Sequence, residues 1–166
     1  MPGLSLPTEQ DLILMLRISL AFIFGAVIGW ERQQDQRPAG LRTHVLVAAG
    51  AAAFTVVSSY GFAGLGASNE PSRLAAQIVT GIGFIGAGVI FIEHRQPHGL
   101  TTAASIWIAA ALGVLAGTGM VWVGIFTTAL TWFVLRVLKR VEGTNPAGAG
   151  KPTPDGGTPD RRPPGV

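Results

Sequence analysis

The sequence LILMLRISLAFIFGAVIGW, residues 12–30, decides the class of fold. Crossing the ~30 Å hydrocarbon core of a bilayer takes about 20 apolar residues of α-helix. Arg17 is the only charged side chain in this run, and a long arginine near a helix end can reach toward the membrane interface. The run therefore predicts a transmembrane helix.

Further apolar runs follow at residues 44–60, 74–92, 101–117 and 120–138. The last two are separated only by a Gly-Thr-Gly turn, so they form either a tight helical hairpin or one long broken helix. We predict an all-α integral membrane protein, a compact bundle of about five short, glycine-rich transmembrane helices. Four spans are the alternative.

The composition also favours a membrane environment. Hydrophobic residues make up 48% of the chain and charged residues 13%, too few for a water-facing globular surface. The absence of cysteine excludes thiolate metal sites, thiol catalysis and disulfides. The net charge is +3, but the basic residues lie in the gaps between apolar runs and in the tail. They form no basic face, so we expect no nucleic-acid partner.

The two ends of the chain differ from its apolar centre. Residues 1–11 lack the basic leader of a secretory signal, so we expect a short N-terminal tail and a retained first helix. Residues from 143 onward are rich in proline and glycine and cannot bury a core. We expect a transmembrane domain over residues 12–140 and a disordered cytoplasmic tail over residues 141–166.

Basic residues are distributed unequally between alternate loops, and cytoplasmic loops usually hold the excess. Arg73 and, at most, Arg17 fall on one side. The other side holds Arg32, Arg37, Arg42, Arg95, Arg136, Lys139 and Arg140. This pattern predicts five spans with the N-terminus outside and the C-terminus in the cytoplasm.

Glycines recur four residues apart, as in the pairs Gly25 with Gly29 and Gly113 with Gly117. Such pairs let helix backbones approach closely in lipid, and close packing is the interpretation we favour.

The third run is denser in glycine, with Gly81, Gly83, Gly86 and Gly88 within eight residues. The spacing imitates a dinucleotide-binding fingerprint, but that motif requires a strand before it and a soluble βαβ unit around it. Two interpretations remain: a face on which neighbouring helices nearly touch, which we favour, or an unwound segment whose carbonyl groups line a site.

Polar residues enter the same run from its outer end. Arg73, Gln77 and Thr80 follow helical spacing and lie on one stripe. Polar groups at that depth need partners or water, which marks Arg73 and Gln77 as candidate binding residues. The alternative is that Arg73 lies at the interface and Gln77 bonds to a neighbouring helix.

A second candidate site is predicted at the cytoplasmic face, where the loops at residues 31–44 and 93–105 enter the membrane. On the predicted topology its members share this face, which suggests one polar site. They are Glu31, Arg42, Thr43, His44, Thr101 and Thr102. The alternative is local: Thr101 and Thr102 satisfy helix backbone groups.

Three blocks occur in order, ERQQDQRPAGLRTH at 31–44, GIGFIGAGVI at 81–90 and GLTTAASIW at 99–107. Together they resemble the MgtC/SapB family of membrane proteins over about residues 20–140. The resemblance implies a multi-pass protein of the bacterial cytoplasmic (inner) membrane. In some members the family is linked to growth in scarce magnesium, to survival inside host cells as a virulence-associated protein, and to partners such as the ATP synthase. Many relatives add a soluble ferredoxin-like domain, whereas the expectation for this chain is a short disordered tail. Any role of that domain is therefore in doubt for this chain.

Two functions remain. The first is a non-enzymatic membrane protein that supports adaptation to low magnesium by regulating or binding other membrane proteins. The second is a transporter or channel for Mg2+ or another small solute. Mg2+ prefers carboxylates and retained waters, yet no Asp or Glu lies inside a predicted span, so we favour the first. We expect contact with the lipid bilayer, a homo-oligomer, no enzymatic activity and no cofactor, and leave a metal site open.

Overall fold

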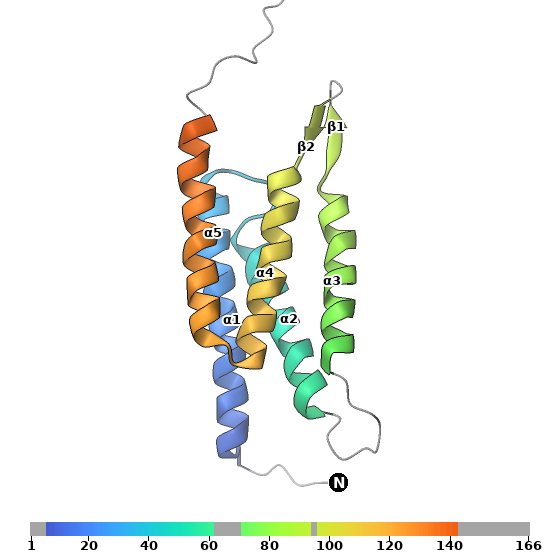
Figure 1. Ribbon diagram of the computed structural model, residues 1–166, viewed down its shortest axis with the longest axis vertical. Helices are drawn as coiled ribbons and strands as arrows, with labels where there is room; N and C mark the ends of the chain where they lie inside the picture. Colours follow the sequence, from blue (N-terminus) through green and yellow to red (C-terminus); the bar gives the residue numbers. More distant parts are fainter. Residues whose placement is uncertain (1–5, 62–70, 94–95, 143–166) are drawn as a thin grey trace, which may run out of the picture.

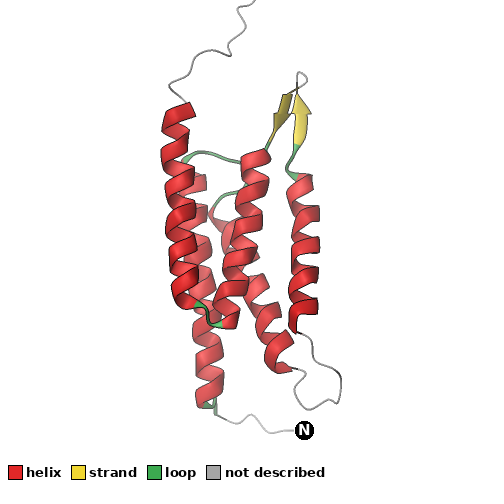
Figure 2. Cartoon of the chain, viewed as in Figure 1, coloured by secondary structure: helices red, strands yellow, loops and turns green. Residues whose placement is uncertain are grey.

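The computed structural model describes residues 6–61, 71–93 and 96–142. These residues form five α-helices and one short β-hairpin (Figures 1 and 2). The elements are α1 (Glu9–Gln34), α2 (Leu41–Val56), α3 (Pro71–Gly88), β1 (Phe91–Glu93), β2 (Gln96–His98), α4 (Leu100–Thr118) and α5 (Val121–Glu142). The predicted all-α membrane bundle is therefore confirmed.

Successive helices run in opposite directions, so α1 begins at the end of the bundle opposite to that where α5 ends (Figure 1). Four stretches are long and apolar enough to cross a membrane: α1, α2 with its π-helical extension Val57–Gly61, α4, and α5 as far as Leu138. Among the described helices, α3 falls short of that requirement. The side of the membrane that each end faces stays a prediction.

The helix α1 begins before the predicted apolar run because it has a complete N-terminal cap. The Thr8 hydroxyl accepts a hydrogen bond from the Asp11 amide at 3.3 Å, and the Asp11 carboxylate accepts one from the Thr8 amide at 2.8 Å. This reciprocal capping box satisfies amides that the first turn leaves unpaired. Residues 9–11 of the expected tail are therefore helical, whereas residues 143–166 of the expected disordered tail lie outside the described residues.

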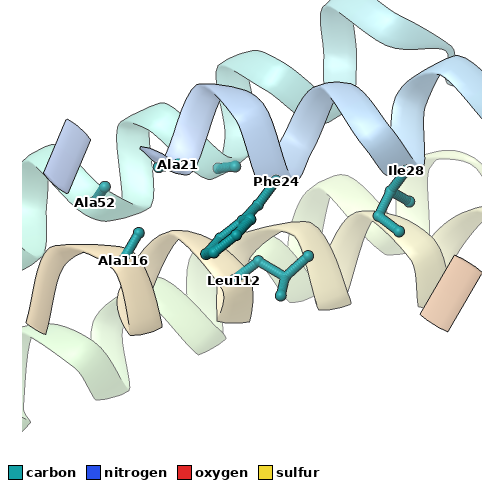
Figure 3. Close-up of a cluster of buried hydrophobic side chains, with 7 residues drawn as sticks. Ala21, Phe24, Ile28, Ala52, Leu112 and Ala116 are labelled. Atoms are coloured by element: carbon teal, nitrogen blue, oxygen red, sulfur yellow. The ribbon is translucent and has the colours of Figure 1, made fainter. Parts of the chain in front are cut away.

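The core lies where α1, α2 and α4 meet. Ala21, Phe24 and Ile28 of α1 face Leu112 and Ala116 of α4, with alanines of α2 completing the cluster (Figure 3). Small residues here are required because the backbones nearly touch.

The glycine pairs on α1 and α4 allow this approach. A Cβ atom on Gly25 would lie 2.7 Å from the His44 carbonyl oxygen, and one on Gly117 would lie 2.9 Å from the Ala52 carbonyl oxygen. Neither distance is compatible with a side chain unless a backbone moves. The predicted close packing of both pairs is confirmed.

The end of α3 corrects the prediction that the third run is helical to residue 92. The helix ends at Gly88, and β1 pairs with β2 in antiparallel register, with Phe91 opposite His98. The two rings stack with centroids 5.5 Å apart. The run of Ile90, Phe91 and Ile92 has the β-branched and aromatic character that favours strands, which explains the change of structure.

A tight turn separates α4 from α5. Gly119 has a φ of 83°, the left-handed region that glycine adopts without strain, and its amide donates to the Ala116 carbonyl at 3.0 Å. The hairpin interpretation of the last two runs is therefore confirmed, and the single broken helix is wrong.

Candidate functional site

The end of the bundle where α1 ends and α2 and α4 begin contains a group of buried polar side chains (upper end in Figure 1). Each is at most 3% exposed. We call this group the polar end; its members are Glu31, Arg32, His44, Thr102 and Ser105.

Helical spacing carries two opposite charges into the polar end. The buried side of α1 includes Ile28 and continues with Glu31 and Arg32, three and four residues later. The two side chains form an ion pair, with Arg32 Nη1 3.9 Å from Glu31 Oε2. Arg32 Nε makes no hydrogen bond within the described residues. Because burying charge costs desolvation free energy, this pair distinguishes the polar end from ordinary packing.

His44 is fully buried and links α2 to α4. Its Nδ1 lies 2.9 Å from the Gly40 carbonyl oxygen, and its Nε2 lies 3.0 Å from the Ser105 hydroxyl oxygen. A carbonyl oxygen only accepts, so Nδ1 carries the proton that is donated to Gly40. The Ser105 hydroxyl also lies 2.8 Å from the Thr102 carbonyl oxygen, which extends the chain of hydrogen bonds into the first turns of α4.

Glycine places α1 against this histidine. A Cβ atom on Gly29 would lie 2.7 Å from the Leu41 Cα and 3.0 Å from the His44 Cβ. The loop before α2 is also fixed, because the Leu41 amide donates to the Gln33 side-chain oxygen at 3.3 Å, and Ala39 is buried. The backbones of α1 and α2 therefore enclose the polar end on one side.

The structure brings together three residues of the predicted cytoplasmic site and leaves the others outside. Glu31, His44 and Thr102 are buried at the polar end. Thr43 is half-buried, and Arg42 and Thr101 are exposed on the first turns of α2 and α4.

Arg32 and Ser105 belong to the same site, although the sequence prediction did not include them. The sequence places Arg32 only among the basic residues of the predicted cytoplasmic side. Its signal was the spacing of four residues from the apolar Ile28, which continues the buried stripe of α1. Ser105 follows Thr101 by four residues and Thr102 by three, but only the position of α2 shows that it meets His44.

The predicted residues of the third run lie elsewhere. Arg73 and Gln77 are exposed near the start of α3, at the opposite end of the bundle from the start of α4 (Figure 1). Thr80 donates its hydroxyl proton to the Ala76 carbonyl at 3.1 Å, a bond within its own helix. Gln77 lines a groove between α2 and α3.

The glycine segment of α3 neither unwinds nor packs closely within the described chain. The helix is regular from Pro71 to Gly88, which argues against the unwound alternative. A Cβ atom on Gly81, Gly83 or Gly88 would meet no atom within 4 Å beyond the adjacent backbone of its own helix. Gly86 alone faces a neighbour, the Ala103 Cβ at an ordinary 3.7 Å. Among the described helices, the close glycine contacts occur on α1 and α4, and at Gly124 of α5.

The chemistry of the polar end is that of hydrogen bonds and one buried ion pair. Carboxylate and hydroxyl oxygens are ligand types that Mg2+ accepts. Over residues 6–61, 71–93 and 96–142, however, no three His, Cys, Asp or Glu side chains lie close enough together to hold a metal ion.

A sequence model of the MgtC family matches residues 18–144, an interval that contains the whole polar end and all of α3. The chain belongs to the MgtC family. The resemblance inferred from the three sequence blocks is thereby confirmed. With its apolar helices, the chain is a multi-pass bacterial membrane protein of this family.

Curated relatives agree with this assignment. The chain is 47% identical over 131 residues to the Escherichia coli K12 protein named "Putative magnesium transporter YhiD", covering 76% of this chain and 61% of YhiD. It is 54% identical over 101 residues to Protein MgtC of Brucella abortus, covering 61% of this chain and 41% of that protein. Protein MgtC of Salmonella typhimurium is 50% identical over 105 residues, covering 63% and 43%. No solved structure matches the chain significantly.

The chain spans between about two fifths and three fifths of the length of these relatives. The names of the relatives therefore describe longer proteins.

Proposed function

We propose that this MgtC-family chain is a non-enzymatic protein of the bacterial inner membrane that supports adaptation to low magnesium by binding and regulating other membrane proteins. The connection to magnesium rests on the family and on the name of YhiD. The choice of regulation over transport rests on the way the helices pack.

The observation that carries the proposal is the closed core between α1, α2 and α4. The side chains of Ala21, Ile28, Ala48, Leu112 and Ala116 are completely inaccessible to solvent. Mg2+ gives up its water reluctantly, so a transport route needs room for a partly hydrated ion and oxygen ligands along its length. Backbones in contact through glycine leave no such room along the centre of these three helices.

The outer helices supply surfaces for association. On α3 Phe84 is 85% exposed, and on α5 Trp122 and Phe126 are 82% and 68% exposed. In a bilayer these faces meet lipid or the helices of another protein, and helices associate there through packing and small residues. We therefore extend the proposal to a homo-oligomer and to a partner in the membrane; the ATP synthase as that partner rests on the family resemblance alone.

Transport of Mg2+ or another small solute is the second candidate. The name of YhiD favours it, as does the buried Glu31 carboxylate at the polar end. A route would then have to run outside the closed core, between protomers or along α3.

One experiment separates the two functions. The purified, folded chain is reconstituted in liposomes, and Mg2+ uptake is followed under an imposed gradient for wild type, Glu31→Gln and Glu9→Gln. Glu9 is an exposed carboxylate at the other end of α1 and is the matched control. In parallel, the variants are tested for rescue of growth in low magnesium in a strain that lacks its own family member.

We expect growth rescue by wild type without protein-dependent Mg2+ uptake, and recovery of a membrane protein by crosslinking in the rescued cells. Uptake that Glu31→Gln abolishes and Glu9→Gln preserves would overturn the regulatory proposal and establish transport.

A further inference from the structure

A groove of about 680 Å³ runs between α2 and α3. Its walls are formed by one face of each helix, from Leu46 to Phe54 on α2 and from Leu74 to Ile85 on α3. Gln77 is the one polar side chain among the residues that line it. The lining of the groove is therefore apolar, with a single polar side chain near one end.

The groove exists because α3 packs more closely on α4 than on α2. Ile82 of α3 joins a buried cluster with Ile106 and Ala110 of α4, and Ala51 of α2 closes the base of the groove. Gly50 on α2 and Gly81 on α3 line the groove, and a Cβ atom on either would meet no atom within 4 Å beyond the adjacent backbone of its own helix. An empty space of this size would forfeit dispersion contacts on both walls, so in a bilayer it is filled either by lipid hydrocarbon or by the side chains of another helix.

The groove has the length of one lipid leaflet. Leu74 and Ile85 are eleven residues apart on a regular helix, which at 1.5 Å per residue is about 16 Å. This is about half of the ~30 Å hydrocarbon core. A single acyl chain from one leaflet therefore fits the length of the groove.

The polar position lies at the end where a lipid headgroup would be. Gln77 lies in the first helical turn of α3 that lines the groove. Arg73 lies one turn further toward the start of α3 on the same face, where it is exposed. A guanidinium group pairs with phosphate through charge-assisted hydrogen bonds. The start of a helix also favours an anion. The apolar groove and the cationic end together match the two parts of a phospholipid.

We propose that the α2–α3 groove binds one phospholipid, with an acyl chain lying between Gly50 and Gly81 and the phosphate held by Arg73 and Gln77. This site is separate from the polar end and does not depend on the proposed regulatory function. The competing occupant of such a groove is a helix from a second copy of the chain, and the test separates the two.

The test measures lipid binding by native mass spectrometry of the full, delipidated chain in detergent. The probes are phosphatidylglycerol and a diacylglycerol with the same acyl chains, which lacks the phosphate. Gly81→Leu fills the groove, and Gly83→Leu is its matched control, because Gly83 is equally open but does not line the groove. Arg73→Gln removes the cation, and Arg42→Gln is its control, an exposed arginine at the start of α2.

We expect wild type to bind phosphatidylglycerol more tightly than diacylglycerol. Gly81→Leu should weaken both lipids about tenfold, and Arg73→Gln should weaken phosphatidylglycerol alone about tenfold. Both controls should bind as wild type does. Should Gly81→Leu fail to fold, Gly50→Leu on the opposite wall replaces it.

Equal lipid binding by Gly81→Leu and Gly83→Leu would overturn the proposal. So would a dimer in the same spectra that Gly81→Leu dissociates while lipid binding stays unchanged, which would assign the groove to a second copy.

Discussion

At the scale of single residues, His44 and Ser105 make three hydrogen-bond contacts, but a neutral imidazole ring and one hydroxyl group supply only two protons for them. Nδ1 of His44 donates to Gly40, so in the neutral ring Nε2 must accept, and the single Ser105 hydroxyl proton is claimed both by Nε2 at 3.0 Å and by the Thr102 carbonyl at 2.8 Å. In the imidazolium form every one of these contacts has a donor and an acceptor. Which of its two acceptors takes the Ser105 proton thus decides whether the neutral ring is hydrogen-bonded to α4.

A double-mutant cycle at this pair tests whether the hydrogen bond joins the two helices. His44→Leu and Ser105→Ala each remove one partner, and each should lower the free energy of unfolding by about 1–3 kcal/mol because the other partner stays buried. The double variant should be less destabilised than the sum of the two, by about 0.5–1.5 kcal/mol. The measurement is the unfolding free energy in a denaturing detergent titration. Strictly additive losses would show that the 3.0 Å contact contributes nothing.

At the scale of elements, the same residue type has opposite roles on two helices. On α4, a Cβ atom on Gly113 would lie 2.8 Å from the Ala51 Cβ and 2.9 Å from the Ala48 carbonyl carbon, so the glycine is required for contact with α2. On α3, Gly83 faces open space and adds only the backbone freedom that weakens a helix. Glycine content alone does not distinguish the two.

Alanine substitution should therefore change stability with opposite sign at these positions. Gly113→Ala should lower the free energy of unfolding by about 1–3 kcal/mol, because the α2 and α4 backbones must separate. Gly83→Ala should leave it unchanged or raise it by up to about 1 kcal/mol through helix propensity. Both are measured by the same detergent titration with wild type as reference. Equal losses at the two glycines would contradict the assignment of the packed face.

Sequence patterns predicted the helices better than their surroundings, for physical reasons. Long apolar runs and a left-handed glycine at Gly119 are local signals, so the five helices and the last turn could be found from the chain alone. Whether Phe91–Glu93 continues a helix or pairs as a strand depends on residues 96–98, with which it pairs. Likewise, Glu31 and His44 could be predicted as site residues because each lies at an end of an apolar run. Arg32 and Ser105 could be assigned to the site only from the relative positions of three helices.

At the scale of the whole molecule, the charges are sorted between the two ends of the bundle. Arg32, Arg37, Arg42 and Arg136 lie toward the end where α1 and α5 finish, and the hairpin is also there (Figure 1). Toward the other end, the described arginines are Arg17 and Arg73. Arg17 is engaged there, since it donates to the Tyr60 hydroxyl at 2.9 Å and to the Gly117 carbonyl at 3.2 Å. The basic excess at one end supports the predicted orientation with the C-terminus in the cytoplasm.

The chain contains no cysteine, so a single introduced thiol reports on this orientation without background. Met120→Cys lies in the turn between α4 and α5, and Gln34→Cys lies at the end of α1; both positions are exposed and at opposite ends of the bundle. Cells expressing each variant are treated with a membrane-impermeant maleimide before and after permeabilisation of the inner membrane. We expect Met120→Cys to be labelled in both samples and Gln34→Cys only after permeabilisation, because cytoplasmic loops retain the arginines. The reverse pattern would invert the topology and place the polar end, with Glu31 and His44, on the outside, where a partner at the cytoplasmic face could not reach it.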